Sequence, residues 1–203
     1  MGRPPTIDRA AVLTAGLAVA DQQGLDALTM QAVARRLGVT AMALYRHVES
    51  KSDLLDGLLE LLMAEFTAPG LGACLPDQFA AVSASVRACA KRHPHVFPLL
   101  MQRPASTPDA RRYRDCLTRA LRDAGVARRE LARTERLIST AILGFAASEA
   151  GGRFTHHSQR ELDRDFARLQ ELLLQFIESQ LPIEPARLDS DHLKPKTTPA
   201  KPR

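Results

Sequence analysis

Residues 41–48 form a short segment whose outward side chains suit contact with nucleic acid. At about 100° of rotation per residue in a helix, Leu44 and Val48 share one face, which we expect to be buried. The opposite face and its edges carry small, apolar, basic and aromatic groups: Met42, Ala43, Arg46, Tyr45 and His47. In a major groove, small and apolar groups can meet thymine methyls, and Arg or His can meet guanine edges. The segment is therefore a candidate recognition helix.

A recognition helix needs a second short helix that crosses it at a tight turn. Ala34 provides a small residue for the crossing, and Gly38 provides the turn. Apolar residues are spaced to pin both helices to a preceding one: Val33, Leu37, Val39, Leu44 and Val48. An ordinary helical hairpin inside a core has the same spacing, so that alternative stays open on these residues alone.

Capping residues predict the helices around this turn. Hydroxyl side chains precede each apolar-periodic run, and Gly24 and Gly38 follow two of the runs as left-handed stops. The expected caps and helices are Thr6 with 7–23, Thr29 with 30–37, Thr40 with 41–48, and Ser52 with 53–66.

The remainder of the chain is also predicted to be helical. The breakers at 68–72 mark the best domain boundary. Further helices are expected at 77–92, 108–124, 129–150 and 159–180, with short pieces between the prolines of 94–104 and a disordered tail at 182–203. The predicted fold class is all-α. Its parts are an N-terminal three-helix helix-turn-helix domain (1–52, with connecting helix 53–66) and a helical C-terminal sensor and dimerisation domain (67–181).

Composition supports this fold and limits the classes of function. The chain has 203 residues with 45% hydrophobic and only 4% aromatic residues. We expect no secretory signal and no membrane span, and hence a cytoplasmic protein with reduced, core-packed cysteines at Cys74, Cys89 and Cys116. The net charge is +5, but residues 1–51 hold six Lys/Arg against four acidic residues, so bulk charge is a weak pointer to DNA.

Residues 8–66 resemble the DNA-binding domain of the TetR (tetracycline repressor) family. The matching segments are Gly24–Thr29, Ala34–Val39, Ala43–Val48, Lys51 and Asp53–Leu55. The resemblance implies a repressor that binds double-stranded DNA at a palindromic operator and is released by a small-molecule effector.

The resemblance also implies roles for individual residues. Thr29 and Thr40, at helix N-termini, would donate to phosphates, and Tyr45 and Lys51 would clamp the DNA backbone. The residues placed to meet bases are Ala41, Met42, Ala43, Arg46 and His47, with phosphate as an alternative partner for Arg46. For Tyr45 the alternative is partial packing with its hydroxyl in water, and for Lys51 it is a solvated loop charge.

Apolar stripes on the last two predicted helices suggest a dimer. The last helix carries a 4-3-4-3 stripe, Leu162, Phe166, Leu169, Leu173 and Phe176, and the preceding one carries Leu131, Ile138, Ile142 and Phe145. Such stripes usually form only the core of the protomer. Members of the TetR family dimerise through their last two helices, so the resemblance favours a homodimer interface.

A cavity for a mainly apolar ligand is expected in the second domain, lined by Phe97, Met101, Tyr113 and Phe145, with Glu149 as a polar anchor. The other inward-looking positions of the sensor helices are Phe66, Phe79, Val82, Val86, Cys89, Leu100, Cys116 and Leu117. Most of these inward positions are expected to be plain core rather than ligand contacts. Segments 93–104 and 143–149 resemble the drug-sensing member of the family, in which a histidine holds a drug-chelated magnesium. Leu99 stands near that place here, so magnesium–tetracycline is not the expected effector.

No pattern predicts catalysis, a cofactor or a metal. The histidines have no metal-ligand spacing on a helix, and His93, His95, His156 and His157 are expected in exposed loops. No phosphate-binding glycine loop, nucleophile elbow or Cys–His constellation occurs. The alternative to a ligand-responsive regulator is a ligand-independent DNA-binding or interaction protein, whose own side chains fill the sensor core.

Overall fold

The computed structural model describes residues 7–67, 74–103 and 107–181. Every regular element in these ranges is helical, which confirms the all-α prediction. The elements are α1 (Arg9–Gln23), the 3-10 turn η1 (Leu25–Ala27), α2 (Met30–Leu37), α3 (Ala41–Leu44), α4 (Lys51–Ala64), α5 (Leu75–Arg92), α6 (Leu99–Gln102), α7 (Pro108–Asp123), α8 (Leu131–Ala150) and α9 (Gln159–Glu178). The predicted boundary at 68–72 and the predicted tail at 182–203 lie outside the described residues.

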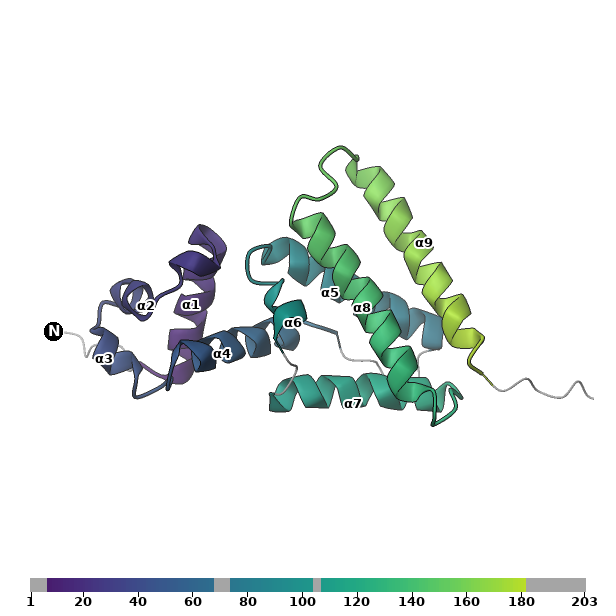
Figure 1. Cartoon of the computed structure of the whole chain (residues 1–203), viewed down its shortest axis with the longest axis horizontal. Coiled ribbons are helices and arrows are strands. Elements are labelled where there is room, and N and C mark those ends of the chain that lie inside the picture. Colours follow the sequence, from purple (N-terminus) through teal and green to yellow (C-terminus); the bar gives the residue numbers. More distant parts are fainter. Residues whose placement is uncertain (1–6, 68–73, 104–106, 182–203) are drawn as a thin grey trace, which may run out of the picture.

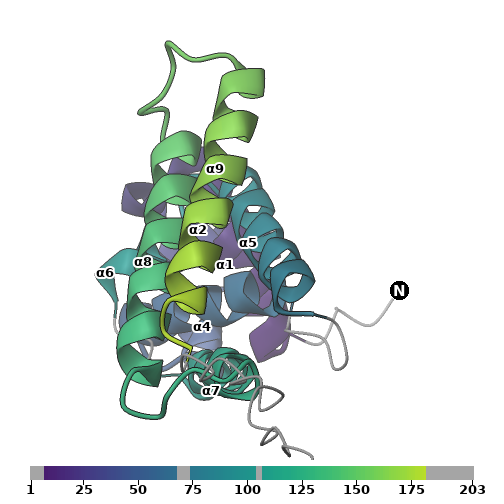
Figure 2. The same ribbon diagram turned by 90° about the vertical axis from the view of Figure 1, so that its right-hand side faces the viewer.

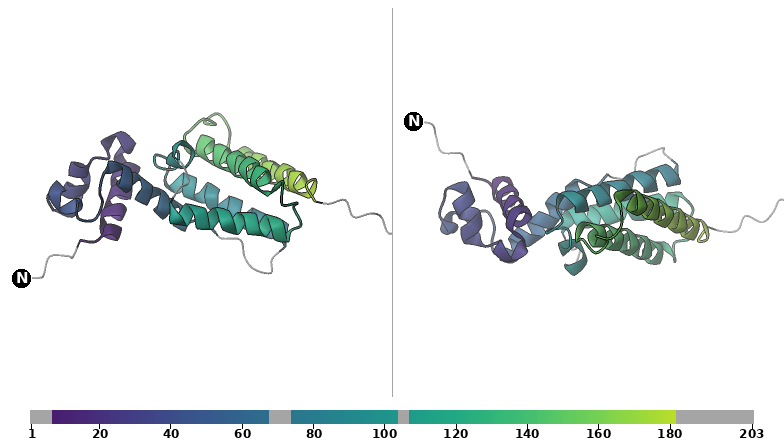
Figure 3. Two further views of the ribbon diagram at one scale, coloured as in Figure 1. Left: turned by 60° about the horizontal axis from the view of Figure 1, so that its bottom comes forward. Right: turned by 90° about the horizontal axis from the view of Figure 1, so that it is seen from above.

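The helices form a small head, α1–α3, and a larger body, α5–α9, with α4 running between them (Figure 1). In the body, α5 packs against α8 and α9, while α7 packs against α4 and α8. Helices α8 and α9 lie side by side (Figure 2). The views in Figure 3 show the same elongated arrangement, with α3 far from the C-terminal end of α9. Helix α4 is thus the element that head and body share.

Local signals explain how the head helices begin and end. The Thr29 hydroxyl accepts a hydrogen bond from the Ala32 amide at 3.1 Å and caps α2, as predicted. Gly38 ends α2 in the left-handed conformation, with φ of 69°, which glycine adopts without strain. Helix α1 begins later than predicted, because the Asp8 carboxylate is its N-cap. The predicted cap, Thr6, lies outside the described residues.

The third helix is shorter than predicted. It ends at Leu44 rather than Val48, because the amides of His47 and Val48 both bond to the Leu44 carbonyl and close the chain into a turn. Thr40 is the N-cap residue, as predicted, although its side chain makes no capping hydrogen bond. The recognition segment is therefore one helical turn followed by a hydrogen-bonded turn.

Helix α4 begins two residues earlier than predicted, at Lys51. Its cap is Ser50 rather than Ser52, because the Ser50 hydroxyl accepts a hydrogen bond from the Asp53 amide at 3.1 Å. The Asp53 carboxylate in turn accepts from the Glu49 amide at 2.8 Å, so two backbone donors at this end are satisfied.

The head and α4 share one core, in which Leu28, Leu44 and Leu54 are fully buried. Helix α1 crosses α4 at Gly57, where an added Cβ would lie 2.3 Å from Leu13 Cδ2, closer than atoms pack. The missing side chain at position 57 therefore sets the close approach of these two helices.

The body helices agree with the predicted ones to within about two residues at each end. Helix α8 starts at Leu131, because the preceding residues close a turn from the Glu130 amide to the Ala127 carbonyl. A capping box formed by Ser158 and Glu161 starts α9. All three cysteines are free, and Cys89 is buried as predicted, but Cys116 is half-buried and Cys74 is exposed rather than part of the core.

Candidate functional site

The recognition segment presents its side chains as the rotation argument predicts. Leu44 and Val48 are buried in the head core, with 0% and 1% exposure. Met42 is 76% exposed and Tyr45 48% exposed, and Arg46 is also exposed. A large apolar, an aromatic and a basic side chain therefore share an outer surface that the chain's own packing does not use. Such a surface can make apolar contacts and donate hydrogen bonds to base edges.

The other predicted DNA contacts lie around this segment. Thr29 and Thr40 are exposed at the starts of α2 and α3, and Lys51 is exposed as the first residue of α4. Three hydrogen-bond donors therefore stand at helix starts, where the backbone dipole also favours an anion. The remaining members of the predicted set are half-buried: Ala41, Ala43 and His47.

An ion pair that the sequence patterns did not reveal braces this surface. The Arg9 guanidinium bonds to both carboxylate oxygens of Asp53, at 2.9 and 2.6 Å, and donates to the His47 carbonyl at 3.1 Å. The hydrogen bonds from Arg9 hold the pKa of Asp53 below its usual value. One arginine of α1 thereby fixes the end of the recognition segment to the start of α4.

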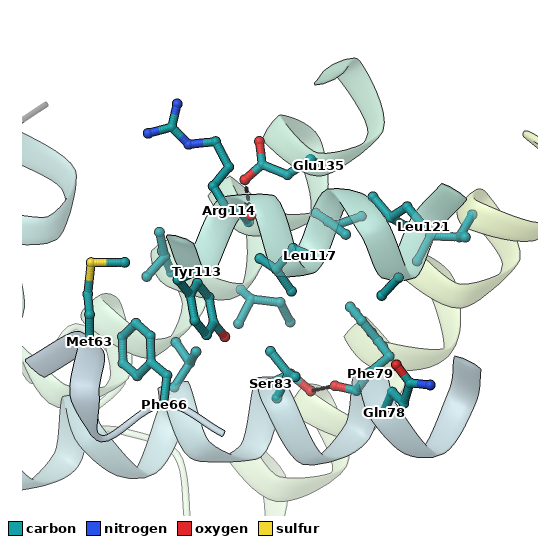
Figure 4. A pocket seen from close by; sticks show the side chains of 18 of the residues that line it. Met63, Phe66, Gln78, Phe79, Ser83, Tyr113, Arg114, Leu117, Leu121 and Glu135 are labelled. Carbon is teal, nitrogen blue, oxygen red and sulfur yellow. Dashed lines mark hydrogen bonds between the residues drawn. The ribbon is translucent and has the colours of Figure 1, made fainter. Parts of the chain in front are cut away.

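The body contains a cavity of about 160 Å³, whose lining residues come from α4, α5, α6, α7, α8 and α9 and from Phe66 just beyond α4 (Figure 4). Its lining is mostly apolar, and the phenol ring of Tyr113 lies within it. The lining residues are Met63, Phe66, Leu75, Gln78, Phe79, Val82, Ser83, Val86, Leu100, Ala110, Tyr113, Arg114, Leu117, Ala120, Leu121, Glu135, Ile138, Ser139, Ile142, Leu143 and Ile177. Met63, in the last turn of α4, lines the cavity, as does Phe66 just beyond the end of α4. The cavity therefore touches the helix that reaches the head.

Of the predicted ligand-binding residues, the cavity is lined by Tyr113 and not by Phe97, Met101, Phe145 or Glu149. Phe97 is fully buried in the core, whereas Met101 is 53% exposed. The Phe145 ring packs against Phe166 at 5.3 Å. Glu149 lies in an ion pair network. Of the other inward positions that the sequence suggested, the structure places six at the cavity and leaves out Cys89 and Cys116: Phe66, Phe79, Val82, Val86, Leu100 and Leu117.

Glu149 has a partner within the chain. Its carboxylate accepts from Arg87 at 2.6 Å and from Lys91 at 2.9 Å, and its side chain is only 5% exposed. Burial alone would raise the pKa of Glu149, but hydrogen bonds from Arg87, Lys91 and Gln159 lower it to about 2. The Arg87 guanidinium also lies 4.7 Å from the Phe166 ring centre. This buried cluster therefore ties α5, α8 and α9 together.

Polar contacts also join the head to the body. His93, at the end of α5, bonds to Asp21 of α1 at 2.8 Å and to Glu65 beyond α4 at 3.0 Å, so it is half-buried rather than an exposed loop residue. Although burial raises the pKa of Glu65, hydrogen bonds from Arg92 and His93 leave it below its usual value. On the other side, Arg103 donates to Asp56 of α4 at 2.8 Å.

The predicted dimer stripe on α9 covers the protomer's own core. Phe166 is buried, and Leu169 and Leu173 are partly buried against the core cluster. The large apolar residues that stay open on α8 and α9 are instead Leu137, at 45% exposure, and Leu172, at 47%. The described residues of the single chain therefore leave one large apolar side chain exposed on each of these two helices.

Comparison with known proteins assigns both parts of the chain to one family. Residues 12–58 match the model of the bacterial regulatory proteins of the tetR family, and residues 79–173 match that of the tetracycline repressor-like C-terminal domain. The HTH-type transcriptional repressor DrrR1 of Streptomyces coeruleorubidus is 30% identical over 179 residues, which cover 86% of this chain and 65% of that protein. The chain thus spans about two thirds of the length of that relative.

Solved structures share the fold. ActR of Streptomyces coelicolor, in complex with actinorhodin, superposes with a TM-score of 0.77 at 18% identity over 88% of this chain and 99% of its own. BioQ, in complex with its double-stranded DNA operator, gives 0.72 at 24% identity over 86% of this chain and 99% of its own.

The class of protein follows from the helical head, its exposed recognition segment and the helical body with its cavity: the architecture is that of a helix-turn-helix regulator. The chain belongs to the TetR family of bacterial regulatory proteins. Among the helices of the described residues, none has the length and apolarity to cross a membrane. The same part of the chain shows no cluster of side chains arranged to hold a metal ion.

Proposed function

We propose that the protein is a transcription repressor that binds a palindromic DNA operator through residues 40–51 as a homodimer in the cytoplasm. The observation that carries this proposal is the outward display of Met42, Tyr45 and Arg46 on a segment whose Leu44 and Val48 are buried. The DNA complex of BioQ and the repressor function in the name of DrrR1 support it. The protein acts by binding, with no catalytic step.

Substitutions at Lys51, Arg46 and His47 test the DNA-binding part of the proposal. Lys51→Ala should weaken binding about equally on operator and random DNA and reduce the salt slope by about one, because it removes one phosphate contact. Arg46→Ala or His47→Ala should change sequence preference, with about 1–3 kcal/mol of discrimination lost for a base contact. Arg160→Ala, which removes an exposed charge from α9, is the matched control. If Arg160→Ala weakens binding as much as Lys51→Ala, the assigned surface is wrong.

The homodimer is proposed to form across α8 and α9. Leu137 and Leu172 are the large apolar residues that stay exposed on these helices, and a two-fold interface would bury them in both protomers. Leu137→Glu combined with Leu172→Glu should give a folded monomer in light scattering, because neither side chain supports the protomer core. Ala167→Glu, at another exposed position of α9, should leave the dimer intact. A dimer that survives the double change would place the interface elsewhere.

We propose further that a small, mainly apolar ligand in the cavity releases the DNA. An unfilled space of about 160 Å³ favours this function over a ligand-independent protein with a filled sensor core. The complex of ActR with actinorhodin shows that a relative of this fold was solved with a small molecule. By linkage, a ligand releases DNA only as far as it binds the DNA-incompetent state more tightly.

A variant that fills the cavity tests the regulatory step. Val86→Phe replaces an isopropyl group of the apolar wall with an aromatic ring that fills part of the cavity. The variant should bind operator normally and lose its response to any compound that raises the melting temperature of the wild type. If the wild-type operator complex survives every stabilising compound, the ligand-independent alternative is favoured instead.

A further inference from the structure

Tyr113 brings an unused hydrogen-bonding group to the cavity. Its ring, on α7, packs edge-on against Phe66 with centroids 5.4 Å apart. Its hydroxyl oxygen is buried and has no hydrogen-bond partner in the structure. Figure 4 shows this oxygen inside the cavity, between α7 and α5. Because a buried hydroxyl without a partner has a cost of about 1–3 kcal/mol, the site is one that a ligand could improve.

The other polar groups of the wall already have partners. The Ser83 hydroxyl donates to the Phe79 carbonyl at 2.6 Å and accepts from Gln170 at 2.6 Å. Glu135 accepts from the Ser139 hydroxyl at 3.0 Å. Among the described side chains that line the cavity, Tyr113 is therefore the one with a buried oxygen and no partner.

The charge and size of the cavity limit its occupant. The Arg114 guanidinium points away from the Tyr113 ring (Figure 4), so no basic group faces the phenol. The charged lining residues, Arg114 and Glu135, both lie away from the Tyr113 oxygen (Figure 4). An ion beside that oxygen would lose its hydration without a counter-charge next to it, which disfavours charged ligands. The volume of about 160 Å³ is close to that of an apolar cavity that accepts benzene, about 150 Å³. The space therefore suits about one aromatic ring.

The phenol acts as a donor. Burial raises the pKa of Tyr113, so its proton stays on oxygen throughout the physiological range. A ligand would satisfy the Tyr113 hydroxyl by offering it a hydrogen-bond acceptor.

We infer that the effector is an uncharged, mainly apolar molecule built around a single ring, and that Tyr113 donates a hydrogen bond to a carbonyl-type oxygen on it. This inference rests on the proposed ligand-responsive function and adds the chemistry of recognition. Tyr113 is the specificity-determining residue, because the rest of the wall recognises only shape and apolar surface.

A pair of isosteric probes tests this assignment. Acetophenone and α-methylstyrene have the same planar shape, but only the first carries a carbonyl oxygen. Their dissociation constants are measured by calorimetry with the full chain, in wild type and in Tyr113→Phe. The change should weaken acetophenone binding about 3–10-fold more than α-methylstyrene binding, the range of one neutral hydrogen bond. Val86→Phe should weaken both probes, which places them in this cavity.

Three results would overturn the inference. The first is equal loss for both probes in Tyr113→Phe, and the second is no binding of either probe to wild type at millimolar concentration. The third is a ligand-free Tyr113→Phe protein that melts several degrees lower, because the hydroxyl would then already have a partner. A separate mobility-shift titration with operator tests the proposed regulation independently of the inference about Tyr113. If the probes bind through Tyr113 but do not release the DNA, the inference stands and the proposed regulation is refuted.

Discussion

The Arg87–Glu149 cluster offers a quantitative test of how the body is held together. Glu149→Gln keeps the shape of the side chain and removes its charge. A pKa lowered from 4.5 to about 2 corresponds to about 3 kcal/mol of folding stability at neutral pH, at 1.36 kcal/mol per unit. Lys91 is 39% exposed and Asp163, which also pairs with Arg87, is 54% exposed, so solvent screens part of this. We expect Glu149→Gln to lower the free energy of unfolding by about 2 kcal/mol.

Urea unfolding at fixed protein concentration measures this loss. Glu171→Gln is the matched control, because Glu171 pairs with Arg168 at 2.8 Å but both side chains are 61% exposed, and its loss should stay below about 0.5 kcal/mol. The pKa of Glu149 is lowered in the folded state, so its contribution is complete above pH 4.5 and disappears as the pH falls toward 2. The difference between wild type and Glu149→Gln should shrink over that interval. Equal stability of the two proteins at pH 7, with no ligand added, would refute the structural role of Glu149.

Three further results are expected. Gly57→Ala should lower stability by about 1–3 kcal/mol in thermal melts through its clash with Leu13, and Leu13→Ala in the same chain should cost less than the sum of the two single changes. Asp53→Asn should cost about 1 kcal/mol at neutral pH in urea unfolding, and because the pKa of Asp53 is lowered on folding, the difference from wild type should fade below pH 4. Burial raises the pKa of the Cys89 thiol to about 12, so a thiol reagent at pH 8 should label exposed Cys74 rapidly and Cys89 only after unfolding; equal labelling rates would contradict the burial of Cys89.

The features that the sequence predicted correctly are those with local causes. Thr29 and Gly38 mark the start and the end of α2 through interactions within a few residues. The burial of Leu44 and Val48 follows from helical rotation alone. The predicted end of α3 at Val48 is four residues too late, because the chain leaves the helix through a hydrogen-bonded turn that needs no glycine or proline.

The lining of the cavity is harder to predict, because its residues come from six helices, α4 to α9. Spacing tells which residues share a face of one helix, but it does not tell which helix lies opposite. Glu149 needed a counter-charge, and the residue that supplies it, Arg87, lies 62 positions away on another helix. Sequence spacing gives no sign that these two residues meet, so the counter-charge of Glu149 within the chain could not be predicted.

Helix α4 has one end at the cavity, through Met63, and the other beside the recognition segment, where it begins at Lys51. Its 14 residues make a rod about 20 Å long, at about 1.5 Å per residue. Tilting such a rod by about 5° about its cavity end moves the far end by about 2 Å. In a two-fold pair the two displacements can add to about 3–4 Å, close to the 3.4 Å rise of one base pair. If the proposed regulation operates through α4, a tilt of about 5° would change the spacing of the two heads by about the rise of one base pair.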